Sequence, residues 1–148
     1  MIQLRDVLLL KHIDWELEAE NRLEAIALLL QELRGDNRIP DFEAFSKVFM
    51  KHVEKEGHTF SILTGGLLLP HCRTDLVDEM LMAFGRLKYP IEDGQIQYIM
   101  LIAVPKEMES DYLRIVGGAC RAFRASIESL NQCRTVREVM ACLSGANI

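Results

Sequence analysis

A histidine follows a short apolar run near the middle of the chain, in the stretch Leu67-Leu68-Leu69-Pro70-His71. Three consecutive leucines are typical of a short buried strand. Pro70 predicts the end of that strand, since proline cannot donate to the hydrogen bonds of a sheet. We therefore expect His71 where the strand leaves the core and meets solvent. An imidazole placed there can act as a nucleophile or carry a proton near neutral pH.

A histidine that accepts a phosphoryl group needs one unprotonated ring nitrogen. The other nitrogen must donate its hydrogen to a fixed acceptor, which sets the tautomer. The phosphate then needs donors: backbone N–H groups of a glycine-rich turn, hydroxyls or cations. The sequence offers these candidates: the turn Thr64-Gly65-Gly66, the hydroxyls of Thr59 and Ser61, and the cations Lys55 and Arg73.

Each of these residues also has a purely structural interpretation, which the sequence leaves open. His71 could cap the end of a strand, and Gly65-Gly66 could serve only as a turn. Lys55 could be a solvated charge at a helix end, and Ser61 could bond to its own backbone.

The remaining histidines are weaker candidates for chemistry. His12 and His52 have charged neighbours, and we expect both at the surface. His58 could approach His71, but a zinc site made of His58, His71 and Cys72 is disfavoured because two of its ligands would be adjacent in sequence. We expect no metal and no cofactor.

The composition is that of an ordinary globular protein, with 49% apolar and 26% charged residues in 148. We expect one domain over residues 1–148. A net charge of −5 disfavours nucleic-acid binding, which needs a basic face. No stretch approaches the roughly 20 apolar residues of a membrane span, and we see no signal peptide. The four cysteines form no metal-binding spacing and are expected as free thiols in the cytoplasm.

Four helices are predicted from apolar spacing and end signals. They cover residues 23–33, 42–53, 110–130 and the segment after Thr135. Asp41 is the expected N-cap of the second helix, and Thr135 and Glu138 form a capping box for the last, which Gly145 ends. The inward face of the third helix is predicted as Leu113, Val116, Cys120, Phe123 and Ile127. Its pair Gly117-Gly118 predicts a close approach to the sheet.

Three strands are predicted at residues 67–69, 80–87 and 96–104, the last two as a hairpin-like pair. Residues 1–19 are ambiguous, although Trp15 and Leu17 alternate with charges and permit a short strand. Helices, then strands, then helices predict an α/β or α+β domain of three layers.

The stretch 55–73, with the strands and helices after it, resembles the type-2 enzyme IIA domain. This is the fructose, mannitol and nitrogen-regulatory family of the bacterial phosphoenolpyruvate-dependent phosphotransferase system. The family pattern is Arg-Glu, then Ser/Thr-Thr and a glycine turn, then an apolar strand ending in Pro-His. Here it reads Lys55-Glu56, Ser61, Thr64-Gly65-Gly66 and Pro70-His71-Cys72-Arg73. The resemblance covers nearly the whole chain, including the helices expected at 23–33, at 42–53 and after Thr135.

The resemblance implies a fold like that of the mannitol enzyme IIA, a three-layer sandwich with a small mixed central sheet flanked by helices. It implies that His71 takes a phosphoryl group from an HPr-like phosphohistidine carrier protein. The group is then passed to an enzyme IIB domain, or its presence is a regulatory signal. The implied phosphate-binding residues are Lys55, Ser61, Thr64, Gly65 and Arg73.

The chain departs from the family pattern at several positions. Lys55 replaces an arginine and loses the planar, two-pronged donor, and Ser61 replaces the usual threonine. Tyr112 stands where members commonly carry a second histidine, and tyrosine is not a cation at pH 7. The glycine turn is also shifted. The chain is therefore identified as a divergent member.

Three interpretations follow from these observations. The first is a phosphotransferase-type carrier that uses His71, with an apolar patch that docks donor and acceptor proteins. The second is a non-catalytic module of the same fold that binds a transporter, a kinase or another partner. The third is an unrelated domain, which a structure with Lys55, Ser61 and Arg73 more than about 10 Å from His71 would favour, since that is beyond hydrogen-bond reach.

Overall fold

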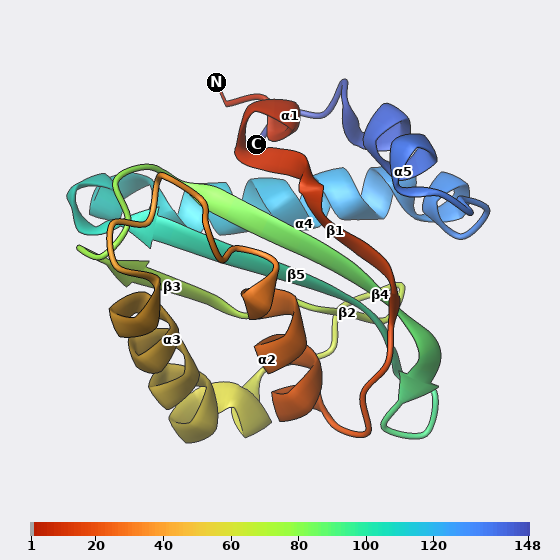
Figure 1. The fold of residues 1–148 in the computed structure, drawn as a ribbon. Coiled ribbons are helices and arrows are strands. Elements are labelled where there is room, and N and C mark those ends of the chain that lie inside the picture. The colour runs from red at the N-terminus through yellow and green to blue at the C-terminus, as the bar shows by residue number, and fades with distance from the viewer. Residues whose placement is uncertain (1) are drawn as a thin grey trace.

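A mixed five-stranded sheet forms the centre of the computed structural model, which describes residues 2–148 (Figure 1). Its strands are β1 (Leu8–Leu17), β2 (Leu67–Leu68), β3 (His71–Thr74), β4 (Leu81–Ile91) and β5 (Ile96–Pro105). The order is β1-β4-β5-β2, and β3 pairs farther along β5. β4 and β5 are antiparallel, and the other pairs are parallel. The expected α+β class with a small mixed sheet is confirmed.

Helices cover both faces of this sheet (Figure 1). α2 (Arg22–Gln31) and α3 (Phe42–Glu56) pack on one face, and α4 (Tyr112–Leu130), α5 (Val136–Leu143) and the short α1 (Leu4–Val7) pack on the other. The 3₁₀ helices η1 (Gly57–Thr59) and η2 (Lys106–Asp111) follow α3 and precede α4. Because strand side chains alternate between faces, the sheet divides the core into two clusters.

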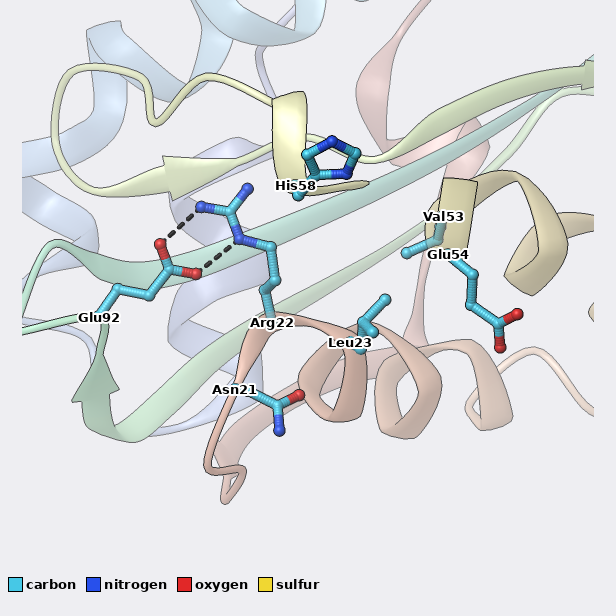
Figure 2. Close-up of a pocket in the computed structure, with 7 residues that line it drawn as sticks. All are labelled: Asn21, Arg22, Leu23, Val53, Glu54, His58 and Glu92. Atoms are coloured by element: carbon cyan, nitrogen blue, oxygen red, sulfur yellow. Dashed lines mark hydrogen bonds and ion pairs between the residues drawn. The ribbon is translucent and has the colours of Figure 1, made fainter. Parts of the chain in front are cut away.

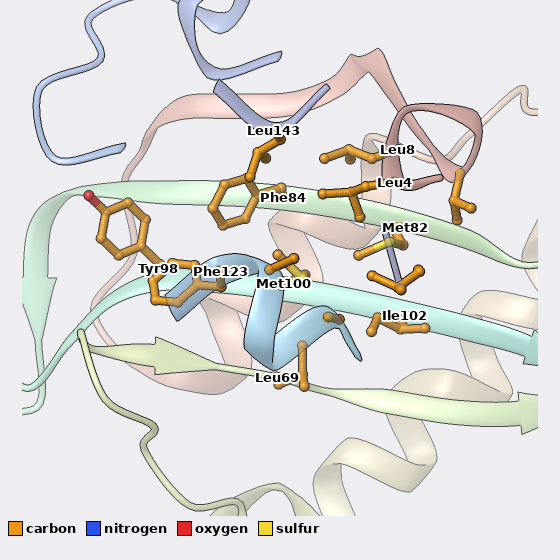
Figure 3. Packing of buried hydrophobic residues seen from close by; sticks show 14 of the residues in the cluster. Leu4, Leu8, Leu69, Met82, Phe84, Tyr98, Met100, Ile102, Phe123 and Leu143 are labelled. Carbon is orange, nitrogen blue, oxygen red and sulfur yellow. The ribbon is translucent and has the colours of Figure 1, made fainter. Parts of the chain in front are cut away.

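The cluster on the α4 side is built around aromatic rings (Figure 3). Phe84, Tyr98 and Phe123 contact one another with ring centroids 5.3–6.2 Å apart. Trp15 joins them from β1 and donates its indole N–H to the carbonyl of Cys133 at 2.9 Å. These contacts fix α4 and the chain after it against the sheet.

Side-chain caps begin α3 and α5 where the sequence predicted them. Asp41 accepts from the N–H of Ala44 at 3.1 Å, and Thr135 accepts from the N–H of Glu138 at 3.2 Å. The capping box is only half formed, because the Glu138 carboxylate accepts from the N–H of Arg134 rather than from that of Thr135. α5 ends at Leu143, before Gly145.

The predicted hairpin of β4 and β5 is confirmed, and both strands are longer than expected. Glu92, Asp93 and Gly94 in its turn all have positive φ, which suits a tight reversal between antiparallel strands. The ambiguous N-terminal region contains the ten-residue strand β1. Its bulges interrupt the alternation of side chains, which explains why the sequence pattern was weak.

The predicted end of the strand before Pro70 is confirmed, but the expectation that the chain leaves the core there was wrong. β2 ends at Leu68, but Pro70 still offers its carbonyl to the N–H of Ile102 at 3.0 Å. His71 then opens β3 and pairs with Ile102 in the same register that aligns Leu68 with Ile99. His71 is therefore half-buried in an edge strand rather than at a strand exit.

The predicted inward face of α4 was partly wrong. Leu113 is 81% exposed, because the helix begins at Tyr112 and turns Ile115, Ala119 and Phe123 toward the core. Residues 106–111 before it are 3₁₀ rather than α-helical.

The glycine pair of α4 meets the C-terminal segment rather than the sheet. A Cβ on Gly118 would lie 2.8 Å from Cα of Ile148, while one on Gly117 would have only the flexible tip of Arg121 nearby, at 3.4 Å. Ile148 is held in place by backbone hydrogen bonds with Ile2. Gly118 therefore makes a close approach, but to the C-terminal segment that pairs with Ile2 and not to the sheet.

His12 is buried rather than exposed, which corrects the expectation. Only 1% of its surface is accessible, and its Nε2 lies 3.4 Å from Asp36, a carboxylate that Arg38 also binds, at 2.7 Å. Burial lowers the pKa of His12, while the hydrogen bond from Arg38 lowers the pKa of Asp36 to about 2. Within residues 2–148, Nδ1 of His12 is the one buried side-chain nitrogen or oxygen without a partner.

Replacing Gly118 with alanine is expected to reduce the free energy of unfolding by about 1–3 kcal/mol, since an added methyl group would displace the backbone of Ile148. Gly117→Ala is the matched control and is expected to stabilise α4 by up to about 1 kcal/mol. Urea unfolding of both variants measures the difference. Equal stabilities would contradict the packing described.

The unfolding free energy is expected to fall as the pH is lowered below about 6.5. The pKa of His12 is lower in the folded state than in the unfolded chain, so the unfolded state binds the proton first. His71 contributes in the same direction, and comparison with His12→Gln separates the two residues. Urea titrations between pH 7.5 and 5 should give a shallower pH dependence for the variant, and an unchanged slope would refute a neutral, buried His12.

Candidate functional site

The side chain of His71 points to the α4 side of the sheet. Leu67 and Leu69 belong to the α4-side cluster, while Leu68 and Cys72 belong to the cluster under α2 and α3. The alternation of strand side chains puts His71 on the face of Leu67 and Leu69. The edge strand therefore aims the imidazole at the first turns of α4.

A backbone carbonyl fixes the orientation of the imidazole. The Pro70 carbonyl faces β5, and successive carbonyls of a strand point in opposite directions. The carbonyl of Leu69 therefore points toward the open edge of the sheet, where it lies 2.6 Å from Nδ1 of His71. A carbonyl can only accept, so Nδ1 carries the hydrogen.

The opposite ring nitrogen, Nε2, is unprotonated in this tautomer. It has no hydrogen-bond partner within residues 2–148, and it is not among the buried atoms that lack one. Nε2 is therefore open to an incoming group. The arrangement has the two properties required of a histidine nucleophile: a free lone pair and a fixed tautomer.

Two aromatic rings enclose the imidazole. Phe60 stacks on it with ring centroids 6.1 Å apart and planes inclined by 20°, and Tyr112 lies 5.6 Å away. Burial lowers the pKa of His71, the hydrogen bond to Leu69 raises it, and the neighbouring charge of His52 lowers it further. The net shift is downward, which favours the neutral imidazole at pH 7.

A cavity of about 330 Å³ opens beside His71. Its lining residues are Thr59, Phe60, Ser61, Leu63, Leu69, His71, Val116 and Cys120. The loop between α3 and β2 forms one wall and α4 forms the other. The structure thus brings Ser61 and Thr59 together with His71, as the sequence suggested, and adds two residues of α4.

Arg73 contacts Tyr112 and an acidic partner, and it is not among the residues that line the His71 cavity. Its guanidinium is 5.1 Å from the centre of the Tyr112 ring and pairs with the exposed Glu109. Burial raises the pKa of Tyr112 to about 12, so its hydroxyl stays protonated at pH 7. The Tyr112 ring therefore contacts both this cation and the imidazole of His71.

Three other candidates are not among the described residues that line the His71 cavity. Lys55 is exposed in the last turn of α3, and Thr64 is exposed in the turn before β2. Gly65 has a φ of +87°, and a Cβ there would lie 3.0 Å from Phe123 and 3.1 Å from Ile127. Its absent side chain allows the turn to contact α4.

Sequence reasoning missed Phe60 and the pair Arg22–Glu92. Phe60 lies between Thr59 and Ser61, which were both predicted as phosphate donors. Its position in the sequence could therefore have identified it as a neighbour of the site. Arg22 and Glu92 are 70 residues apart, and no local pattern connects them. They help to line a second cavity, of about 390 Å³, with His58 (Figure 2).

The described residues contain neither a metal-binding cluster nor a helix that could span a membrane. Within residues 2–148, no group of three or more histidine, cysteine or acidic side chains is placed to hold a metal ion. In the same range, no helix combines the length and apolar character needed to cross a bilayer.

One protein family matches almost the whole chain. The sequence model of the phosphoenolpyruvate-dependent sugar phosphotransferase system, EIIA 2, matches residues 6–146. Among curated protein sequences, no significant match is found.

Solved structures with similar folds include a nitrogen regulatory protein and a mannitol protein. The nitrogen regulatory protein IIA-Ntr of Neisseria meningitidis is 21% identical, with a TM-score of 0.76 over 93% of this chain and 97% of that one. The IIA mannitol protein of Escherichia coli is 19% identical, with a TM-score of 0.70 over 90% and 96%. A complex of enzyme IIA mannitol with phosphorylated IIB from the same organism gives a TM-score of 0.70 at 18% identity, over 91% and 95%.

We expect His71 to titrate below the ordinary histidine value of 6.5 and to carry its hydrogen on Nδ1 in the neutral form. The reasons are the burial of the ring and the carbonyl of Leu69. Nitrogen-detected NMR of the imidazole over a pH series measures both properties. A hydrogen on Nε2, or a pKa at or above 6.5, would contradict this description of the site.

Proposed function

The chain belongs to the EIIA 2 family of the phosphoenolpyruvate-dependent sugar phosphotransferase system, and we propose that Nε2 of His71 accepts a phosphoryl group from an HPr-like phosphohistidine protein. The observation that carries the proposal is the 2.6 Å contact between Nδ1 and the Leu69 carbonyl. It leaves Nε2 as the free nucleophile, beside a cavity with room for a phosphoryl group.

In the proposed transfer, the lone pair of Nε2 forms a bond to phosphorus as the nitrogen–phosphorus bond of the donor breaks. The donor imidazole keeps the released electron pair. The ring of His71 then gains formal positive charge, which its Nδ1–H shares with the Leu69 carbonyl. No proton has to leave His71, so the protein acts mainly by positioning and charge stabilisation.

The proposed ligands of the phosphate differ in how directly they can reach it. Ser61 lines the cavity with His71, and its hydroxyl can donate a hydrogen bond to a phosphate held there. Arg73 would have to exchange Glu109 for the phosphate, and Lys55 would have to extend over the cavity from the end of α3. Thr64 and Gly65 would contribute through the backbone of their turn.

Tyr112 is proposed to occupy the place of the second histidine of the family. It contacts the imidazole ring of His71, and its neutral hydroxyl can donate one hydrogen bond without adding positive charge. This difference predicts slower transfer or a weaker hold on the phosphate than a protonated histidine would give. It does not remove the nucleophile.

The recipient is proposed to be an enzyme IIB domain or a regulatory target in the cytoplasm. Support comes from the similar IIA mannitol protein, which is solved in complex with phosphorylated IIB. Leu113, which follows Tyr112 in α4 and is 81% exposed, is proposed as an apolar contact for this partner. The same exposed leucine would equally serve the alternative function, a module that docks a partner without steady transfer of phosphoryl groups.

Phosphorylation in vitro tests the proposal. The protein, phosphoenolpyruvate, enzyme I and each available HPr-like carrier should yield an acid-labile mass increase of a single phosphoryl group. The increase should disappear in His71→Ala and persist in His58→Ala, which removes an exposed histidine lining the other cavity.

Either of two results would overturn the proposal. A folded protein that no carrier phosphorylates would favour the docking module, and a phosphoryl group retained in His71→Ala would place the acceptor elsewhere.

A further inference from the structure

Arg22, whose pair with Glu92 is drawn in Figure 2, joins three parts of the chain. It is the first residue of α2, directly after the N-cap Asn21. Its Nε and Nη2 both bind the carboxylate of Glu92, in the turn between β4 and β5, at 2.6 Å. Its Nη1 donates to two backbone carbonyls, Gly57 at 2.7 Å and Phe60 at 3.1 Å.

The two carbonyls lie at the start of the loop that lines the His71 cavity. Gly57 begins η1, and Phe60 ends it with an N–H bond to the Gly57 carbonyl at 3.2 Å. Phe60 then contributes the ring that stacks on His71. Arg22 therefore holds the backbone at both ends of this short helix and ties it to the β4–β5 turn.

The guanidinium is well suited to this arrangement. It offers five N–H donors in a fixed plane. Here Nε and Nη2 bind the carboxylate, and Nη1 donates to the two carbonyls. Its side chain is only 15% exposed, which reduces competition from water. A lysine has neither the plane nor the reach to satisfy all three partners.

We propose that Arg22 is a positioning residue for phosphoryl transfer, which acts by holding the Phe60 carbonyl and thereby the ring that encloses His71. The proposal adds a residue that positions the same site, and it rests on the proposed function. Arg22 does not touch the imidazole, so its effect on transfer passes through the loop. Loosening of the loop would displace Phe60, admit water to the imidazole and disorder the wall that carries Ser61.

Arg22→Lys is the principal test, with two readouts. The rate of His71 phosphorylation is expected to fall about tenfold, since small displacements of positioning groups have effects of that size or larger. Independently of any phosphoryl donor, the pKa of His71 in NMR titration is expected to rise toward 6.5 as water reaches the ring. The titratable and charged groups around His71, namely His52, Arg73, Tyr112 and Cys120, are unchanged in this variant.

Two control variants separate the carbonyl contacts from other effects. Glu92→Gln removes the ion pair but keeps both carbonyl bonds, and it should alter both readouts less than Arg22→Lys does. Arg34→Lys alters an exposed arginine that binds Glu43 at 2.7 Å. Its partners Gln31, Glu43 and Phe42 are not cavity residues, so it should leave both readouts unchanged.

Each outcome decides the proposal. Arg22→Lys that keeps either the wild-type rate or the wild-type titration of His71 would overturn it. An unfolded Arg22→Lys, seen as loss of amide dispersion, would also overturn it, because the role of Arg22 would then be general stability. If even the wild type is not phosphorylated, the proposed function fails, but the titration still shows whether Arg22 controls the environment of His71.

Discussion

The site depends on the outward-pointing carbonyl of Leu69 at the open edge of the sheet. Its direction follows from the parallel register of this edge with β5, which turns the Pro70 carbonyl toward Ile102. An edge strand leaves every second carbonyl unpaired. Here the imidazole of His71 takes the place of a missing neighbouring strand and donates to that carbonyl. Sheet register, rather than a side-chain partner, therefore sets the histidine tautomer.

The surroundings of the imidazole are assembled from segments far apart in sequence. Phe60 comes from the loop after α3, while Tyr112 and Cys120 come from α4. All are placed by elements that pack on the sheet. The reactivity of His71 is therefore coupled to the packing of the helices on both faces of the sheet. An enclosure made largely of apolar groups favours the neutral imidazole, which is the form that can attack phosphorus.

Local patterns were enough to predict the helix starts after Asp41 and Thr135, the β4–β5 hairpin and the α+β class. The caps at Asp41 and Thr135 and the apolar runs are short-range signals, which explains that success. The failures concern long-range contacts. His12 resembles a surface residue until Asp36 and Arg38 are folded against it. Leu113 was assigned to the wrong face because the true start of α4 depends on the preceding 3₁₀ turn. The Arg22–Glu92 pair has no local signature at all.

The central claim is that the Leu69 carbonyl decides which nitrogen of His71 reacts. The most direct measurement is therefore the position of the bond in the phosphorylated protein. Phosphorus–nitrogen coupling in ¹⁵N-labelled protein reports it without cleavage of the chain. Phosphorus is expected on Nε2, with Nδ1 still bearing the hydrogen that Leu69 accepts. Phosphorus on Nδ1 would require the hydrogen bond to break and would contradict the account.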